Sequence, residues 1–457
     1  MAECIRKWAS PLKSSAQSSL EPNSTSTAAA DLSNDSSAAD AFARAFKATL
    51  IYSNKEWFRR KNEVFEPICP ELVQGIAKDF FQRQADKRCL TRNRINAAVE
   101  LSRARFHLEP SHMDANPDVV GCRDGSVMDL ITGRKVDGGN DFVTKKLGAN
   151  VNSAASSPEW LRFLNRIFEG DVELIDFVQR AVGYSLSGSV REQCMFMLIG
   201  NGMNGKSTFL NTVHHLFGDY AATIPMQTLM EQKNGSTQTN DLAYLVGKRF
   251  VAASEGERGQ RLAESKIKMM TGGDRIPCRA LYKDYFEFDP QFKLWLATNN
   301  LPTITGMDDA IWRRIMVIPF PVTIPASERD KTLSARLAQE LSGIFHWAMQ
   351  GLKLWRQQGL NPPPQVLQST KIYRDDNDTV GQWIEGGCIV EAEVRATMKE
   401  LYDSYKSWCE NSAADALSNN CFGKELTRRG FKSIRARLGN GRRGIGLKPE
   451  TVHLKAA

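Results

Sequence analysis

The sequence predicts an α/β fold built around a parallel sheet that is buried on both faces. Between residues 194 and 320, four short apolar runs alternate with helical or looped segments, and they read CMFMLIG, RFVAASE, FKLWLATNN and RIMVIPF. Parallel strands covered by helices on both sides give such near-continuous apolar runs. A glycine-rich loop and a helical segment follow the first run. At 457 residues, the chain is long enough for roughly two to four folded units.

Changes in composition divide the chain into six segments. The first segment is rich in Ser and Ala with little to bury, so we expect a disordered tail. A small mixed α/β domain follows, with a hairpin that turns at Gly125 and Gly133. Helical spacing of apolar residues from Trp160 onward predicts a helical collar or linker. The segments are 1–40 (tail), 41–150 (mixed domain), 151–190 (collar), 191–325 (core), 326–380 (helical region) and 381–457 (C-terminal domain).

Overall composition narrows the class of protein. Lys and Arg outnumber Asp and Glu by 60 to 52, a mild bias that permits nucleic-acid binding without establishing it. The nine cysteines include no CxxC pair, so neither a zinc ribbon nor a disulfide framework is indicated. There is no apolar run of roughly eighteen residues and no apolar stretch in Met1–Ser10. We therefore expect a protein of the cytoplasm, in a bacterial host, with no membrane contact.

The glycine-rich loop after the first apolar run matches a phosphate-binding pattern. Gly200 to Ser207 fits GxxxxGK[ST], with a strand-like run before it and a helix-like run after it. Backbone N–H groups of such a loop close around a phosphate, Lys206 reaches the β and γ oxygens, and the Ser207 hydroxyl suits Mg²⁺. We expect ATP and Mg²⁺ as cofactors. The expected nucleotide-binding residues are Gly200, Asn201, Gly202, Asn204, Gly205, Lys206, Ser207 and Thr208.

Polar side chains flank the other apolar runs. Hydrolysis needs a carboxylate at the metal and a group that orients water. We assign Glu255 to the Mg²⁺ shell and Glu257 to the water. The sequence also permits the opposite assignment of these two roles. Asn299 ends the third run and is a candidate γ-phosphate sensor. Arg313 and Arg314 precede the fourth run, where a subunit edge can offer a guanidinium to a neighbour's site. Solvated carboxylates and a surface arginine pair are the alternatives.

The C-terminal segment is the most basic. Between Cys421 and Lys448, nine Lys or Arg accompany one acid, Glu425. Two helix-like segments and a hairpin around Gly439 and Gly441 follow the order of a winged helix. Contact with phosphates explains such a cluster, and a solubilising basic tail is the alternative. The candidate DNA contacts are Arg428, Arg429 and Lys432 on the expected recognition helix and Arg435, Arg442 and Arg443 on or near the wing.

Four segments, in order, resemble the superfamily 3 helicase core of phage, plasmid and poxvirus primase-helicases. They are GNGMNGKST, RFVAASEGERG, KMMTGGDRIPCRALYKDYFEFDPQFKLWLATNN and GMDDAIWRRIMVIPF. The resemblance covers about residues 41–457 and implies an AAA+ type P-loop ATPase core. It implies a ring, typically a hexamer, that translocates along DNA and separates its strands. The implied roles are nucleotide and metal binding for Lys206 and Ser207, the acidic pair for Glu255 and Glu257, the sensor for Asn299, and the trans-acting finger for Arg314, with Arg313 as the alternative.

The resemblance also implies a hairpin that grips DNA in the ring channel. Here it corresponds to about residues 276–288, with Lys283 as the phosphate contact and Tyr282 or Tyr285 beside it. Lys266, Lys268 and Arg279 would add positive charge. One departure concerns the domain before the helical segment, which at about 110 residues is too short for a fused primase. We therefore expect a separate primase or host replication proteins to supply primers.

Two other classes of protein use the same loop. A P-loop kinase needs the phosphate loop but neither a basic hairpin nor a winged helix. A DNA-bound AAA+ initiator or loader also hydrolyses ATP, but it remodels a partner rather than unwinding DNA. Stimulation of ATP turnover by single-stranded DNA distinguishes a helicase from a kinase, and strand separation on a forked duplex distinguishes it from a loader.

Overall fold

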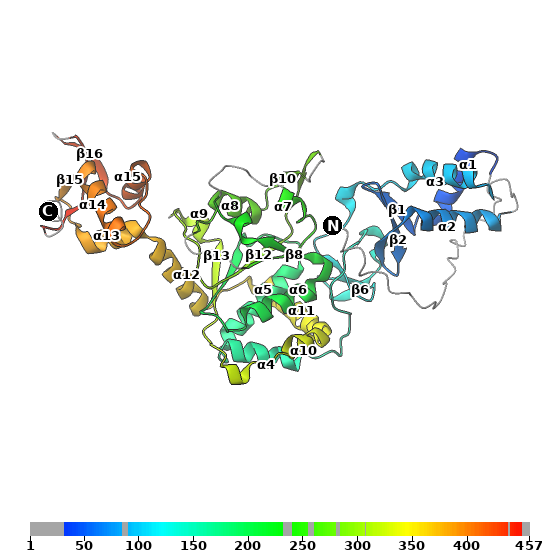
Figure 1. Cartoon of the computed structure of the whole chain (residues 1–457), viewed down its shortest axis with the longest axis horizontal. Helices are drawn as coiled ribbons and strands as arrows, with labels where there is room; N and C mark the ends of the chain where they lie inside the picture. The colour runs from blue at the N-terminus through cyan, green and yellow to red at the C-terminus, as the bar shows by residue number, and fades with distance from the viewer. Residues whose placement is uncertain are drawn as a thin grey trace. The chain divides into compact units, whose positions relative to one another are not determined.

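The structure is a computed structural model, and it describes residues 32–84, 90–231, 240–254, 260–279, 284–306, 308–436 and 439–449. The described chain forms two compact units, which meet in sequence between Met113 and Asp114 (Figure 1). This boundary lies inside the range 41–150 that the sequence analysis treats as one domain. Within the described residues, no helix combines the length and the apolar character that a membrane crossing requires.

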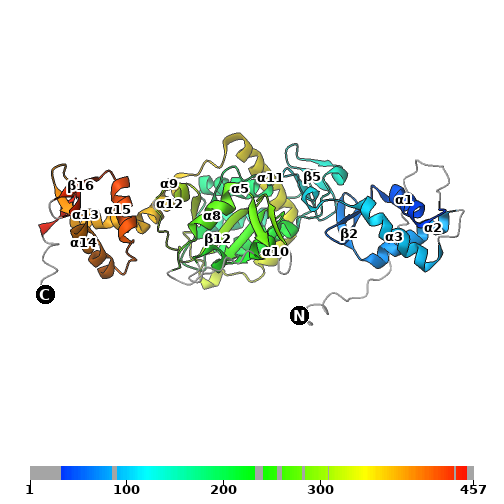
Figure 2. The ribbon, with the colours of Figure 1, turned by 90° about the horizontal axis from the view of Figure 1, so that it is seen from above.

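The first unit packs three helices against a three-stranded antiparallel sheet (Figure 2). Phe42, Trp57, Phe81 and Phe106 are buried in its core. The first helix is capped by Asn34, whose side chain accepts from the backbone N–H of Ser37, so residues 35–40, which the sequence analysis assigns to the tail, are helical. The rest of the predicted tail, up to residue 31, lies outside the described residues. The elements are α1 (Asp35–Phe46), β1 (Leu50–Ser53), β2 (Glu56–Lys61), β3 (Val64–Ile68), α2 (Pro70–Arg83) and α3 (Arg92–Phe106).

The second unit opens with a small antiparallel sheet and two helices. The sheet turns at Gly125 and Gly133, both of which have positive φ (79° and 67°), as a hairpin needs at such positions. The predicted hairpin is therefore confirmed. The elements are β4 (Val119–Gly121), β5 (Val127–Asp129), β6 (Arg134–Val136), α4 (Pro158–Ile167) and α5 (Val172–Leu186).

A five-stranded sheet forms the core of this unit. Its order is β13-β7-β12-β9-β8, and every neighbouring pair is parallel. The predicted α/β fold with a parallel sheet is confirmed. The strands are β7 (Met195–Ile199), β8 (Ala221–Pro225), β9 (Phe250–Ser254), β12 (Lys293–Thr298) and β13 (Ile315–Pro319).

Both faces of this sheet are covered, because successive strand residues point to opposite sides. Phe196, Leu198 and Trp295 pack against one set of helices, whereas Met197 and Leu296 pack against another. Figure 1 shows helices on both sides of the sheet. The first set comprises α4, α5, α6 (Lys206–Phe217), α10 (Leu333–Gln339) and α11 (Leu341–Gln358). The second comprises α7 (Asn240–Ala243), α8 (Glu264–Gly272) and α9 (Asp309–Trp312). The helix α12 (Pro364–Asn377) contributes to both, with Val366 in the first cluster and Tyr373 in the second. A hairpin, β10 (Ile276–Arg279) and β11 (Tyr285–Phe288), follows α8.

The C-terminal part is a small helix and sheet assembly around Trp383, Tyr405 and Phe422. Its three-stranded antiparallel sheet has the order β15-β17-β16. The elements are α13 (Thr379–Gly387), β14 (Cys388–Ile389), β15 (Arg395–Thr397), α14 (Met398–Asn411), α15 (Asn419–Arg428), β16 (Lys432–Ala436), β17 (Gly439–Arg443) and β18 (Gly446–Leu447).

One assignment in this part differs from the sequence analysis. Lys432 was expected on the second helix, but α15 ends at Arg428 and Lys432 begins β16. The helix stops because Gly430 adopts a φ of +93°, a left-handed conformation that commonly ends helices. Lys432 therefore lies on the strand that follows the helix.

Candidate nucleotide site and nucleic-acid surfaces

The glycine-rich loop joins the end of β7 to the start of α6, as the sequence predicts. Gly205 has a φ of +88°, and a Cβ at this position would come within 2.7 Å of Ile167 Cγ2. A Cβ at Gly200 would lie 2.6 Å from the backbone carbonyl oxygen of Phe320, which cannot move aside as a side chain can. Both positions therefore require glycine. The loop ends at the N-terminus of a helix, where unpaired backbone N–H groups favour anions.

Lys206 lies at the centre of this loop and is held by neutral oxygen atoms. Its Nζ donates to the carbonyl of Gly200 (2.7 Å), to Asn204 Oδ1 (3.1 Å) and to Asn299 Oδ1 (3.0 Å). Burial lowers the pKa of the Lys206 ammonium, because a low-dielectric environment disfavours charge. Its hydrogen-bonding partners within the described residues include no carboxylate, so its charge is not neutralised there. This arrangement suits an anionic ligand.

Asn204 has an unused donor beside Lys206. The residue is only 3% exposed, and its Nδ2 is buried without a hydrogen-bond partner in the part of the chain that the structure describes. A buried donor of this kind costs free energy unless something accepts from it. The orphan donor, the exposed Ser207 hydroxyl and the positive-φ loop together fit a polyphosphate with its metal ion.

Asn299 reaches Lys206 because of the strand register. β12 lies between β7 and β9, and Thr298 is opposite Ile199. The residues that follow these two strands, Asn299 and Gly200, therefore meet at one edge of the sheet. β9 ends at the same edge, with Ser254 beside Ala297. Glu255 and Glu257 come next in sequence and lie outside the described residues.

Arg313 and Arg314 lie at the other edge of the sheet. They precede β13, whose first residue, Ile315, is opposite Met195 at the start of β7. The phosphate loop begins after Ile199, four residues further along β7. At about 3.3 Å per residue, the two edges are separated by about 13 Å.

The two arginines differ in accessibility. Arg313 is exposed, and its Nη2 donates to Gln193 Oε1 (3.1 Å). Arg314 is 8% exposed and donates to the carbonyl of Ala310. Burial, followed by the charge of Arg313, lowers the pKa of Arg314. Of the two, Arg313 is the one that a neighbouring molecule can contact without rearrangement.

Some expected DNA contacts of the core lie on α8 and the β10–β11 hairpin. Arg279 lies 5.3 Å from the ring centroid of Tyr285, which is 70% exposed. Lys268 forms an ion pair with Asp308 (2.9 Å). Tyr282 and Lys283 fall outside the described residues. The described part of the hairpin thus presents one arginine stacked on an exposed ring, a combination found where proteins contact nucleic acid.

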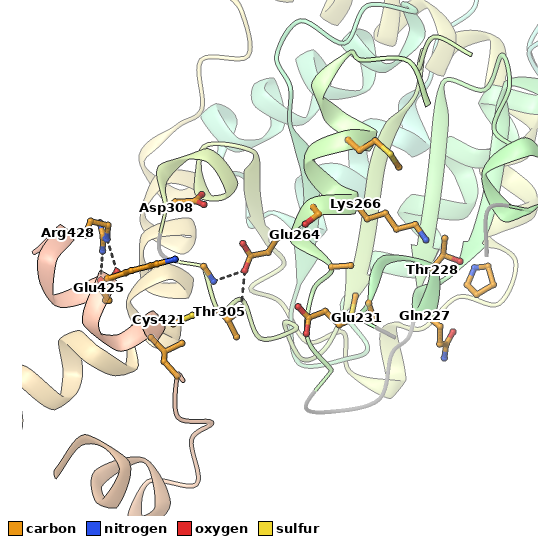
Figure 3. A pocket seen from close by; sticks show the side chains of 18 of the residues that line it. Gln227, Thr228, Glu231, Glu264, Lys266, Thr305, Asp308, Cys421, Glu425 and Arg428 are labelled. Atoms are coloured by element: carbon orange, nitrogen blue, oxygen red, sulfur yellow. Dashed lines mark hydrogen bonds and ion pairs between the residues drawn. The ribbon is translucent and has the colours of Figure 1, made fainter. Parts of the chain in front are cut away.

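A cavity of about 1050 Å³ lies beside α8 and reaches α15. Lys266 and Glu264 line it from α8, and Lys424 and Arg428 line it from α15 (Figure 3). Burial lowers the pKa of Lys266. Acidic side chains, including Asp241, also line the cavity, so its wall carries charges of both signs.

Most of the C-terminal arginines expected to contact DNA have internal partners. Arg428 and Arg429 both form ion pairs with Glu425, and Arg429 also pairs with Asp378. Arg442 is buried and donates to the carbonyl of Gly423 (2.6 Å). Arg443 pairs with Glu393. By contrast, Lys432 and Arg435 are exposed and have no ion-pair partner among the described residues.

The fold and this site define the class of the protein: an α/β protein with a P-loop core. Comparison with known families and structures agrees. Residues 39–169 match a family described as "D5 N terminal like", and residues 198–314 match DUF5906, a family of unknown function. A solved apo structure of the NrS-1 C terminal region (305-718) covers 87% of this chain and 96% of its own, with a TM-score of 0.50 and 14% identity. This last likeness concerns the fold alone.

Similar proteins occur in large DNA viruses. "Putative helicase L207/L206" of Acanthamoeba polyphaga mimivirus is 28% identical over 333 residues, which is 67% of this chain and 34% of that protein. "Putative helicase 022R" of Frog virus 3 is 28% identical over 273 residues, or 54% of this chain and 27% of that protein. "Putative primase C962R" of African swine fever virus is 19% identical over 341 residues, or 69% and 35%.

These matches confirm the resemblance to the phage, plasmid and poxvirus primase-helicase group. The matched family regions lie at the expected positions, one ahead of the phosphate loop and one across it. The chain spans about a third or less of the length of each of these curated relatives.

Proposed function

We propose that the protein is an ATP-dependent DNA helicase that assembles as a ring, typically a hexamer, translocates on DNA and unwinds duplex during replication of a virus, phage, plasmid or other mobile element. The observation that carries the proposal is the position of Lys206. Its ammonium lies between the phosphate loop and Asn299, at the edge where parallel strands end. This is where open α/β sheets bind their ligands. The names of the viral relatives favour a helicase among the proteins that use such a site.

The proposed reaction is hydrolysis of ATP to ADP and phosphate. Water attacks the γ phosphorus, the bond to the β–γ bridging oxygen breaks, and the proton of the water is released. Lys206 and the backbone N–H groups of the loop would hold the β and γ phosphates, and Ser207 with Glu255 would hold Mg²⁺, which neutralises developing charge. Glu257 would orient the water, and Asn299 would contact both the water and the γ phosphate.

The opposite-edge position of Arg313 and Arg314 favours a shared site. Across about 13 Å of sheet, neither guanidinium reaches the phosphate loop of its own subunit. An arginine that acts in trans stabilises the charge of the transferring phosphoryl group. A ring in which this edge of one subunit faces the loop of the next would make ATP turnover depend on assembly.

The C-terminal part supports DNA binding. Its strand order β15-β17-β16, with α14 and α15 between β15 and β16, is the arrangement that we interpret as a winged helix, with the β16–β17 hairpin as the wing. Lys432 and Arg435 are exposed on β16. The exposed Tyr285 on the β10–β11 hairpin provides a second surface, suited to a single strand.

Two measurements on the full chain test the proposal. ATP turnover should rise when single-stranded DNA is added, and a forked duplex should separate while ATP is consumed. Lys206→Ala, in which turnover should fall about a hundredfold or more, serves as the control. Indifference of ATP turnover to DNA would favour a kinase, and DNA-stimulated turnover on a fork that stays paired would favour the initiator or loader. Either result would contradict the helicase proposal.

A further inference from the structure

The segment that follows Asn299 is attached to two different helices. Residues 299–306 leave β12 at the edge where Asn299 contacts Lys206. On one side, the backbone N–H of Gly306 donates to Glu264 of α8 (2.6 Å), a contact visible beside Thr305 in Figure 3. On the other side, the segment contacts α12. The segment that begins at Asn299 is therefore held at points beyond its own strand.

Two residues of α12 make the second attachment. The hydroxyl of Tyr373 donates to the carbonyl of Pro302, and Asn377 Oδ1 accepts from the backbone N–H of Ile304 (2.8 Å). Tyr373 and Asn377 are four positions apart, so they lie on the same face of the helix. Asn377 Nδ2 also donates to the carbonyl of Tyr373 (2.8 Å), which fixes the orientation of its amide.

Both side chains are held firmly. Tyr373 is 3% exposed, and its ring packs edge-on against Trp312 with 5.3 Å between centroids. Burial raises the pKa of the Tyr373 hydroxyl, so it stays protonated and keeps donating. The helix α12 itself is fixed to β13, the outermost strand of the sheet, because Thr370 Oγ1 accepts from the backbone N–H of Val317 (3.0 Å).

The same helix leads directly into the C-terminal part. Asp378 follows Asn377, accepts from the backbone N–H of Gly381 (2.8 Å) to begin α13, and pairs with Arg429 at the end of α15. Asn377 thus contacts the segment that follows Asn299. The next residue, Asp378, contacts the C-terminal part, which we propose binds DNA.

We propose that Tyr373 and Asn377 are positioning residues for Asn299, and that α12 thereby couples the C-terminal part to ATP turnover. The inference rests on the proposed ATPase function. Loss of either contact would leave Asn299 less well placed for the transition state, and small misplacements of this kind lower turnover strongly. Binding of ATP to the phosphate loop would change little, because neither residue contacts that loop among the described residues.

Three variants and one matched control of the full chain test this. Asn377→Ala removes the acceptor for the Ile304 N–H, and Asn377→Asp keeps an oxygen there. Tyr373→Phe removes the hydroxyl but keeps the ring against Trp312. Gln382→Ala is the control. Gln382 donates to the carbonyl of Asp375 at the same helix end (2.8 Å), and its hydrogen bonds within the described residues include none to residues 299–306.

We expect Asn377→Ala to lower kcat about tenfold with KM for ATP within about twofold of wild type. Stimulation of ATP turnover by single-stranded DNA should also fall in Asn377→Ala. We expect the same changes in kcat and in DNA stimulation for Tyr373→Phe. Asn377→Asp should restore most of the rate, and Gln382→Ala should match wild type. Melting temperatures of all four report whether each variant folds.

The outcomes separate two kinds of failure. Unchanged kcat and DNA stimulation in both Asn377→Ala and Tyr373→Phe would overturn the positioning role, as would equal losses in the Ala and Asp variants. A loss of kcat that leaves DNA stimulation intact would overturn the coupling. Absence of ATP turnover in the wild-type protein would instead overturn the proposed function from which the inference starts.

Discussion

The two edges of the central sheet both hold cations bound by neutral oxygens, yet the surroundings of these cations differ. At the carboxyl edge, Lys206 contacts a glycine loop and two amide side chains. At the amino edge, Lys293 donates to the carbonyls of Ser187 and Ser189, and Arg249 donates to the carbonyls of Leu186, Asn116 and Val119. A buried cation alone therefore does not identify a ligand site.

The surroundings of each cation make the difference. Lys293 and Arg249 are each only 1% exposed, and they attach the sheet to residues 186–189 and to the β4 region. Lys206 instead lies at a helix N-terminus beside an exposed Ser207 and beside Asn204 Nδ2, which has no hydrogen-bond partner among the residues that the structure describes. Backbone carbonyls cannot leave their positions, whereas a lysine held partly by amide side chains can exchange them for phosphate oxygens.

The largest effect is expected at the amino edge, from the arginine pair. One of Arg313 and Arg314 supplies the trans-acting guanidinium in the proposed ring. We expect its replacement with Ala to lower kcat about a thousandfold, whereas ATP binding should be retained. Mixing that variant with Lys206→Ala subunits, which keep both arginines, should restore part of the turnover. If mixtures show no restoration, the site is not shared between subunits, and the amino edge has only a structural role.

The next effect concerns the carboxyl edge. Lys206→Ala should lower ATP turnover by about a hundredfold or more, as loss of one preorganised donor does elsewhere. Its melting temperature should stay near that of wild type, because the shorter Ala side chain leaves space in which water can bind the three oxygens that Lys206 releases. Turnover near the wild-type rate would remove Lys206 from the phosphate site.

Lys293→Met is the variant at the amino edge that we compare with Lys206→Ala at the carboxyl edge. The substitution keeps the volume but leaves the carbonyls of Ser187 and Ser189 without their donor, and we expect a cost of about 1–3 kcal/mol in the free energy of unfolding. Chemical denaturation followed by fluorescence measures it. ATP turnover per folded molecule should be unaffected. A variant with normal stability and impaired turnover would reverse the assignment of the two edges.

The local parts of this site could be predicted from the sequence. The phosphate loop is contiguous, and strands buried on both faces leave apolar runs whose ends identify Asn299. What the sequence did not reveal are contacts made across long separations. Asn377 reaches Ile304 and Asp378 reaches Arg429 without any periodic pattern that links them. The placement of Lys432 on a helix was wrong for a local reason, the left-handed Gly430.

The same limitation affects the basic C-terminal part. In sequence, Glu425 is the only acid among nine cations, and the segment reads as strongly positive. In the fold, Asp378 and Glu393 come from outside this segment to pair with Arg429 and Arg443. Charge density along a sequence therefore overstates the charge that is available to a phosphate.

The smallest effect tests that distinction within the C-terminal part. Replacing Lys432 and Arg435 together with Ala should weaken duplex DNA binding and flatten the dependence of log K on log salt by about two units, roughly one for each lost phosphate contact. Arg442→Ala should leave that slope unchanged and lower the melting temperature, because Arg442 is buried and donates to the carbonyl of Gly423. Binding titrations at several salt concentrations measure both slopes. Equal slopes for the double variant and wild type would mean that β16 does not contact the DNA backbone, and a flatter slope for Arg442→Ala would mean that its guanidinium leaves its buried position to bind DNA.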